Sequence, residues 1–147
     1  MEKKTLIVET LKDLGLRPIL EGNMVTFRYQ LKNIFCIIDD EPDDYICLFY
    51  PDFYEVSATE KISALYACNK VAKDIRHVKV YVDDDIEFIS ASSEFFFNSK
   101  ESLKLGIKNG LELFGIIGTW IVQVLTEFNS DKDILPISKS SDDEEQR

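Results

Sequence analysis

The segment VYVDDDIEF, residues 80–88, places three consecutive aspartates between two short apolar runs. Aspartate favours turns because its side chain bonds the local backbone. Consecutive strand side chains point to opposite faces, and the segment lacks the alternating ligands and the glycine of a calcium loop. We therefore predict a hairpin turn at Asp83, Asp84 and Asp85 and no metal site. The acids between residues 39 and 44 are interpreted in the same way.

Around this turn, HVKVYV (77–82) and IEFISAS (86–92) have the composition of two paired strands. Upstream, helical spacing predicts a helix from Thr59 to Ile75, with Thr59 as its cap. Its apolar positions are Ile62, Leu65, Cys68, Ala72 and Ile75. The same spacing predicts a first helix over residues 3–14, which ends at Gly15.

Between these helices, the runs RPIL, MVTFRYQ, NIFCIID and YICLFYP alternate with EGN, LKN and DEPDD, the pattern of an antiparallel meander. Gly22-Asn23 predicts a tight turn. The alternation of Phe27, Tyr29 and Leu31 with polar residues predicts a strand with one wet face. The apolar run 34–38 predicts a central or doubly covered strand. The fold class is therefore α+β, an antiparallel sheet of five to six strands with helices packed on it, in the order α-β(3-4)-α-β-β-α.

The last helix is predicted to start at a capping box, Asn98-x-x-Glu101, and to end near Phe128. One apolar stripe consists of Leu103, Ile107, Leu111, Phe114, Ile121, Leu125 and Phe128. A second band beside it consists of Leu113, Ile116, Ile117, Trp120 and Val124. One sheet cannot cover both bands, so we predict a dimer or target-protein interface, with a fully internal helix as the alternative. Four glycines, Gly106, Gly110, Gly115 and Gly118, are expected to permit close backbone approach.

Bulk properties restrict the classes of function. The 147 residues fit one domain, predicted over 1–128, followed by a flexible acidic tail over 129–147. A net charge of -10 argues against nucleic acid and anionic membrane partners. Three cysteines without C-x-x-C spacing indicate reduced thiols, and with no signal-peptide core they predict a cytoplasmic protein. The uncharged run Leu113–Thr126 is shorter than the roughly 20 residues of a spanning helix.

No catalytic constellation is visible. His77 is the only histidine, which rules out paired-histidine zinc motifs. Neither a G-x-S-x-G elbow nor a phosphate-binding glycine loop is present, so we expect no enzyme activity and no cofactor. Aromatic clusters around Tyr50 and Phe53, and at Phe95 and Phe97, predict either core or edge packing or a binding surface.

The stretch ALYACNKVAKDIRHVKVYVDDDIEFISASSEFF, Ala64–Phe96, resembles the YbjN-like family, whose fold is similar to type III secretion chaperones. The resemblance implies a non-enzymatic, often dimeric module associated with regulation, stress or assistance to other proteins. It brings no catalytic residues to this chain, and Asn69 is interpreted as structural. The glycine-rich last helix and the acidic tail depart from the family.

The leading hypothesis is a cytoplasmic module that forms a homodimer and holds a protein segment through its sheet or its last helix. The alternative is a small-molecule or lipid pocket between the sheet and the last helix, lined by Tyr50, Phe95, Phe97 and Trp120. A hydrolase that uses the acidic turns is disfavoured by their spacing.

Overall fold

A computed structural model describes residues 2–130, so the predicted tail lies outside the described residues apart from its first two positions. The elements are α1 (Lys3–Asp13), β1 (Ile19–Glu21), β2 (Met24–Tyr29), β3 (Lys32–Ile37), β4 (Tyr45–Glu55), the 3-10 turn η1 (Ala58–Glu60), α2 (Lys61–Asp74), β5 (Lys79–Val82), β6 (Phe88–Phe96) and α3 (Lys100–Ser130). The six strands form one antiparallel sheet in the order β1-β2-β3-β4-β6-β5. The predicted class and order of elements are confirmed.

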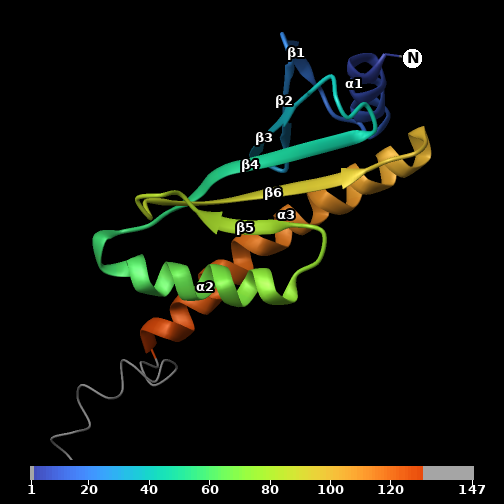
Figure 1. The fold of residues 1–147 in the computed structure, drawn as a ribbon. Coiled ribbons are helices and arrows are strands. Elements are labelled where there is room, and N and C mark those ends of the chain that lie inside the picture. Colours follow the sequence, from blue (N-terminus) through green and yellow to red (C-terminus); the bar gives the residue numbers. More distant parts are fainter. Residues whose placement is uncertain (1, 131–147) are drawn as a thin grey trace, which may run out of the picture.

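The helices cover one face of this sheet. The strand register places Val25, Cys36, Leu48 and Ser93 side by side across β2, β3, β4 and β6, and all four are buried. Because strand side chains alternate between faces, this row marks the covered face. It shares one core with residues of α1, α2 and α3. In Figure 1, α3 runs diagonally along the sheet and contacts both α1 and α2.

The long helix α3 is confirmed, but its predicted capping box is wrong. The helix begins at Lys100, and the cap is built one residue later than expected: the Ser102 backbone N–H donates to Ser99 Oγ at 3.0 Å. The Ser99 N–H in turn donates to Ser102 Oγ at 3.1 Å. The two serine hydroxyls thus make the reciprocal bonds that were assigned to Asn98 and Glu101.

By length and composition alone, α3 is apolar enough to cross a membrane. Nine of its residues are nevertheless buried inside the domain, where they contact the sheet, α1 and α2. The first predicted stripe accounts for six of them, and Phe128 is half-buried against Tyr66 with ring centroids 5.5 Å apart. In this structure α3 therefore serves as the core helix of the domain.

Two of the four helix glycines permit the predicted close approach. A Cβ on Gly106 would overlap the Phe95 ring, and a Cβ on Gly110 would lie 2.8 Å from Ser93 Oγ. Both contacts are made with β6, so these glycines let α3 lie directly on the sheet. At Gly115 a Cβ would make only an ordinary contact, and at Gly118 it would meet open space. The expectation was wrong for Gly118.

Two features of the meander differ from expectation. The β2–β3 hairpin turns at Gln30 and Leu31, which both have positive φ, so Leu31 is an exposed turn residue and does not continue the strand. The run 34–38 lies on a central strand, as predicted, but it is not doubly covered because Ile37 is 52% exposed. The Gly22-Asn23 turn is confirmed.

Helix α2 buries a different stripe from the one predicted. Its buried positions are mostly small, namely Ser63, Ala64, Ala67, Cys68 and Val71. Small side chains let α2 approach β5 and α3 closely, which turns Ile62 and Leu65 outward into solvent. The cap also differs from the prediction. The capping residue is Ser57 and not Thr59: the backbone N–H and the hydroxyl of Ser57 both donate hydrogen bonds to Glu60 Oε1 at the start of η1.

Candidate functional site

The face of the sheet opposite the helices has no element packed on it within residues 2–130. Aromatic pairs lie on this face: Phe35 pairs with Phe49 between β3 and β4, and Tyr45 pairs at the strand ends with Phe96, which is 67% exposed. We call this surface the open face. By register its members are Ile19, Glu21, Met24, Thr26, Arg28, Asn33, Phe35, Ile37, Tyr45, Cys47, Phe49, Lys79, Tyr81, Ser90, Ser92, Glu94 and Phe96.

The charges of the open face cancel. Glu21 and Glu94 offset Arg28 and Lys79, whereas the whole chain carries a net charge of -10. The open face is therefore a neutral, largely apolar area on an acidic protein. Exposed apolar patches of this kind are characteristic of interaction surfaces.

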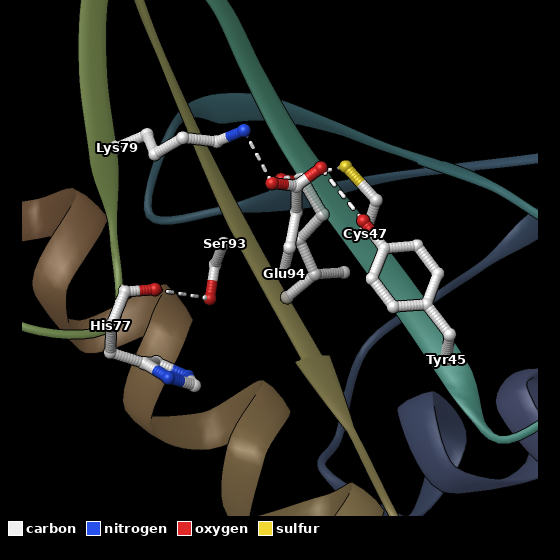
Figure 2. A network of polar contacts seen from close by, with 7 residues as sticks. Tyr45, Cys47, His77, Lys79, Ser93 and Glu94 are labelled. Carbon is white, nitrogen blue, oxygen red and sulfur yellow. Dashed lines mark hydrogen bonds and ion pairs between the residues drawn. The ribbon is translucent and has the colours of Figure 1, made fainter.

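One polar network crosses the open face (Figure 2). Glu94 on β6 accepts a 2.7 Å hydrogen bond from Tyr45 Oη on β4 and forms an ion pair with Lys79 on β5. The bond from Lys79, and then that from Tyr45, lowers the pKa of Glu94. Partial burial and the bond to Glu94 raise the pKa of Tyr45. The network links three neighbouring strands and keeps the Glu94 carboxylate charged and satisfied.

The thiols are not set up as nucleophiles. Cys47 lies beside Glu94 on the open face, and burial together with that negative charge raises its pKa to about 11. Burial raises the pKa of Cys36 and of Cys68 to about 12. Because the thiolate is the reactive form, all three cysteines are almost fully protonated at neutral pH.

The predicted interface residues of α3 separate into three groups. Ile117 and Val124 are buried in the core and are not available to a partner. Leu113 and Trp120 are partly buried against the core. Ile116 alone is well exposed, at 52%. The second apolar band is therefore mostly internal, because α3 packs against α2 as well as against the sheet.

The predicted aromatic residues do not meet in one pocket. Tyr50 stacks on Phe53 at 4.9 Å, and both line a cleft of about 460 Å³ between β4 and the Gly115–Gly118 part of α3. Phe95 lies against Gly106, and Trp120 is roughly 21 Å further along α3 at the rise of a helix. Phe97 is buried near Leu6 of α1. The four-residue pocket proposed between sheet and helix is not formed.

The acidic segment is a turn, as predicted. Asp83 Oδ1 accepts hydrogen bonds from the backbone N–H groups of Glu87 and Phe88, at 2.7 and 2.8 Å, and so closes the β5–β6 hairpin. These bonds, that from Phe88 first, lower the pKa of Asp83. The turn also brings the exposed carboxylates of Asp83, Asp85 and Glu87 within 4.8 Å of one another, a grouping not expected from sequence.

His77 is a junction residue between α2 and β5, as expected. Its Nε2 lies 3.1 Å from the backbone oxygen of Gly106, and its own backbone oxygen accepts a bond from Ser93 Oγ. These contacts connect the junction to α3 and to β6 (Figure 2 shows the bond to Ser93). His77 therefore has a structural role in this arrangement.

The open face itself was not singled out from sequence. The signal was present in the strand patterns: Phe35 and Ile37 alternate with the core residues Ile34 and Cys36. A run that is apolar at every position predicts cover on both faces. In this structure the cover is present on one face only.

No family model and no curated protein matches the sequence. Solved structures do match. YbjN from E. coli superposes with a TM-score of 0.59 at 12% identity, over 86% of this chain and 91% of that chain. The fold is similar to that of YbjN.

Two chaperone structures share this fold with YbjN. One is the HopA1-SchA chaperone-effector complex, with a TM-score of 0.54, 14% identity, and 80% and 91% of the two chains covered. The other is the Yersinia pestis type III secretion chaperone SycH bound to a stable fragment of YscM2, with a TM-score of 0.54, 13% identity, and coverage of 80% and 98%. The expected YbjN-like and chaperone-like fold is confirmed.

Proposed function

We propose that this protein is a non-enzymatic, chaperone-like module of the cytoplasm that binds an extended segment of another protein on its open face. The observation that carries the proposal is the apolar surface of β3, β4 and β6 that no element among residues 2–130 covers, with Ile37 and Phe96 exposed at the ends of β3 and β6. Two solved structures with this fold hold a protein partner or a protein fragment, as their descriptions state.

The open face suits an extended chain with alternating apolar side chains. Neighbouring strands lie about 4.8 Å apart, so the rows of aromatic and aliphatic groups form shallow channels of strand width. A segment laid across them buries its apolar side chains against Phe35, Phe49 and Phe96 and keeps its other side chains in water. Because the charges of the open face cancel, an apolar segment that covers it does not bury an uncompensated net charge.

We further propose that two copies pair through the exposed surface of α3 around Ile116. This surface lies on the helix side of the sheet, so a dimer formed there leaves both open faces accessible. Val122, also half-exposed, lines the neighbouring cleft with Gly118 and extends the apolar surface available to a second copy.

A matched pair of variants separates the two surfaces. Ile37 and Ile116 are each 52% exposed, one on the open face and the other on α3. Burying the exposed half of an isoleucine contributes about 1 kcal/mol, so Ile37→Ser should weaken binding of alternating Val/Thr peptides about fivefold. It should not alter the mass measured by light scattering. Ile116→Ser should shift the protein toward monomer and leave peptide affinity unchanged.

Peptide affinity is measured by fluorescence anisotropy with a labelled nine-residue peptide. Equal affinity of the wild-type protein and Ile37→Ser contradicts the use of the open face. A wild-type protein that is monomeric at micromolar concentration contradicts pairing through α3 without affecting the first proposal.

A further inference from the structure

A cavity lies at the corner of the open face where the short strand β1 begins. Its volume is about 590 Å³, and its walls come from the α1–β1 connection and from the β2–β3 hairpin. The apolar part of the wall is supplied by Leu16, Ile19, Phe27, Ile34 and Phe35. Ile19 and Phe35 are also members of the open face, so the cavity opens onto the proposed peptide surface.

Two arginines stand at this cavity. Arg17 and Arg28 both line it, and none of the residues that line it is acidic. Neither arginine forms an ion pair with any residue between 2 and 130. Arg28 uses one guanidinium nitrogen to donate a 3.2 Å bond to the Leu31 backbone oxygen, which holds its side chain near the hairpin. Two unpaired positive charges beside an apolar cavity contrast with the net charge of -10 of the chain.

The backbone next to the cavity is open to a partner. β1 pairs with β2 only as far as Ile19 and Thr26, so the outer edge of β2 beyond Thr26 has no strand partner in the described chain. An extended segment that lies on the open face can reach this corner and place one side chain in the cavity. A carboxylate on a neighbouring position then meets planar guanidinium groups, which bind carboxylates with two parallel hydrogen bonds.

We propose that this corner cavity selects segments in which an apolar residue lies next to an aspartate or glutamate. The apolar side chain fills the cavity, and the carboxylate accepts hydrogen bonds from Arg17 and Arg28. The inference rests on the proposed function and adds to it the chemical character of the segment. It also gives the segment a preferred position, because the rest of the open face carries no excess charge.

The test uses two labelled, end-capped nine-residue peptides of alternating valine and threonine. One carries a central glutamate and the other a central glutamine. Because the alternation is regular, either peptide can shift along the open face until its central residue reaches Arg17 and Arg28 and a neighbouring valine enters the cavity. The glutamate peptide should bind about three- to tenfold more tightly at low salt, the size expected for two exposed charge pairs. The difference should shrink at 0.5 M salt because exposed charges are screened.

The variant that decides the proposal is Arg17→Gln combined with Arg28→Gln. It should remove the preference for glutamate, so that the variant binds the glutamate and the glutamine peptide with equal affinity. Arg76→Gln is the matched control, because Arg76 is exposed in the connection before β5, at the other edge of the sheet. It should keep the full preference.

The outcomes are distinct. If neither peptide binds, the proposed function fails. If both bind equally, or if the double variant keeps the preference, the open face binds segments but the arginine cavity does not select them. If dodecanoate binds in an arginine-dependent way while the two peptides bind alike, the cavity is a fatty-acid site and the proposal is wrong.

Discussion

Alanine substitutions at Gly110 and Gly118 are expected to change stability in opposite directions, although both glycines lie inside α3. In a helix interior, alanine is more stable than glycine by about 0.5–1 kcal/mol because it loses less backbone entropy. At Gly118 the new Cβ meets no atom within 4 Å, so Gly118→Ala should realise the full gain. For a domain of this size that corresponds to a rise in Tm of about 1–4 °C.

At Gly110 the same Cβ would lie 2.8 Å from Ser93 Oγ and 3.1 Å from Ser93 Cβ. Ser93 is buried on β6 and its hydroxyl donates to the His77 backbone oxygen, so it cannot move away freely. Overpacking of this kind costs about 1–3 kcal/mol. This cost is larger than the stabilisation that alanine contributes through its higher helix propensity. Gly110→Ala should therefore lose about 1 kcal/mol net, and the two variants should differ by about 2 kcal/mol.

Urea unfolding followed by circular dichroism at 222 nm, at one fixed protein concentration, measures both values. Repeating Gly110→Ala in a Ser93→Gly background isolates the contact with Ser93 as a coupling free energy of about 1–2 kcal/mol. If both alanine variants stabilise the protein equally, or if the coupling is zero, the close packing of α3 on β6 is refuted.

Three further predictions concern the β5–β6 turn, the Glu94 network and residues 131–147. Asp83→Ala should lower the urea midpoint, because it removes the acceptor for the Glu87 and Phe88 backbone N–H groups, whereas Asp84→Ala should leave the midpoint unchanged. The lowered pKa of Glu94 means that its network stabilises the fold above pH 4.5, the ordinary pKa of a glutamate, and that this contribution is lost as pH falls through the folded pKa. Wild-type Tm should accordingly drop more steeply than that of Glu94→Gln below pH 4.5, and parallel curves would show that the network contributes nothing. Deleting residues 131–147 should leave Tm within about 1 °C of the full chain in calorimetry, and a large drop would mean that this segment packs on the domain.

The order of elements could be predicted because each element has a clear local pattern. VYVDDDIEF carries both strands and the turn of a hairpin, and the α3 stripe from Leu103 to Leu125 keeps helical spacing over the whole helix. The β2–β3 turn could not be placed in this way. Gln30 and Leu31 take positive φ without the usual asparagine or glycine, and the apolar alternation continues into Leu31.

The candidate site depended on tertiary packing, which a local pattern does not contain. From the sequence alone, Ile117 and Val124 look like apolar surface that the sheet cannot cover. In the structure both are buried, because α2 packs on a second side of α3. The opposite holds at Ile37, where the apolar run predicts cover on both faces but no element among residues 2–130 packs on the open face. The number of helix and sheet layers in the fold decides which apolar residues stay exposed. That number depends on how all the elements pack together and cannot be inferred from one segment.

Chemical-shift mapping by NMR tests the central claim most directly. A ¹⁵N-labelled protein is titrated with the glutamine peptide, which tests the open face independently of the arginine cavity, and backbone amide shifts are followed for residues 2–130. The account predicts saturable changes along β3, β4 and β6, centred on Ile37, Cys47 and Phe96, with α3 unaffected. Changes confined to α3 and α2, with the strands unmoved, would contradict it.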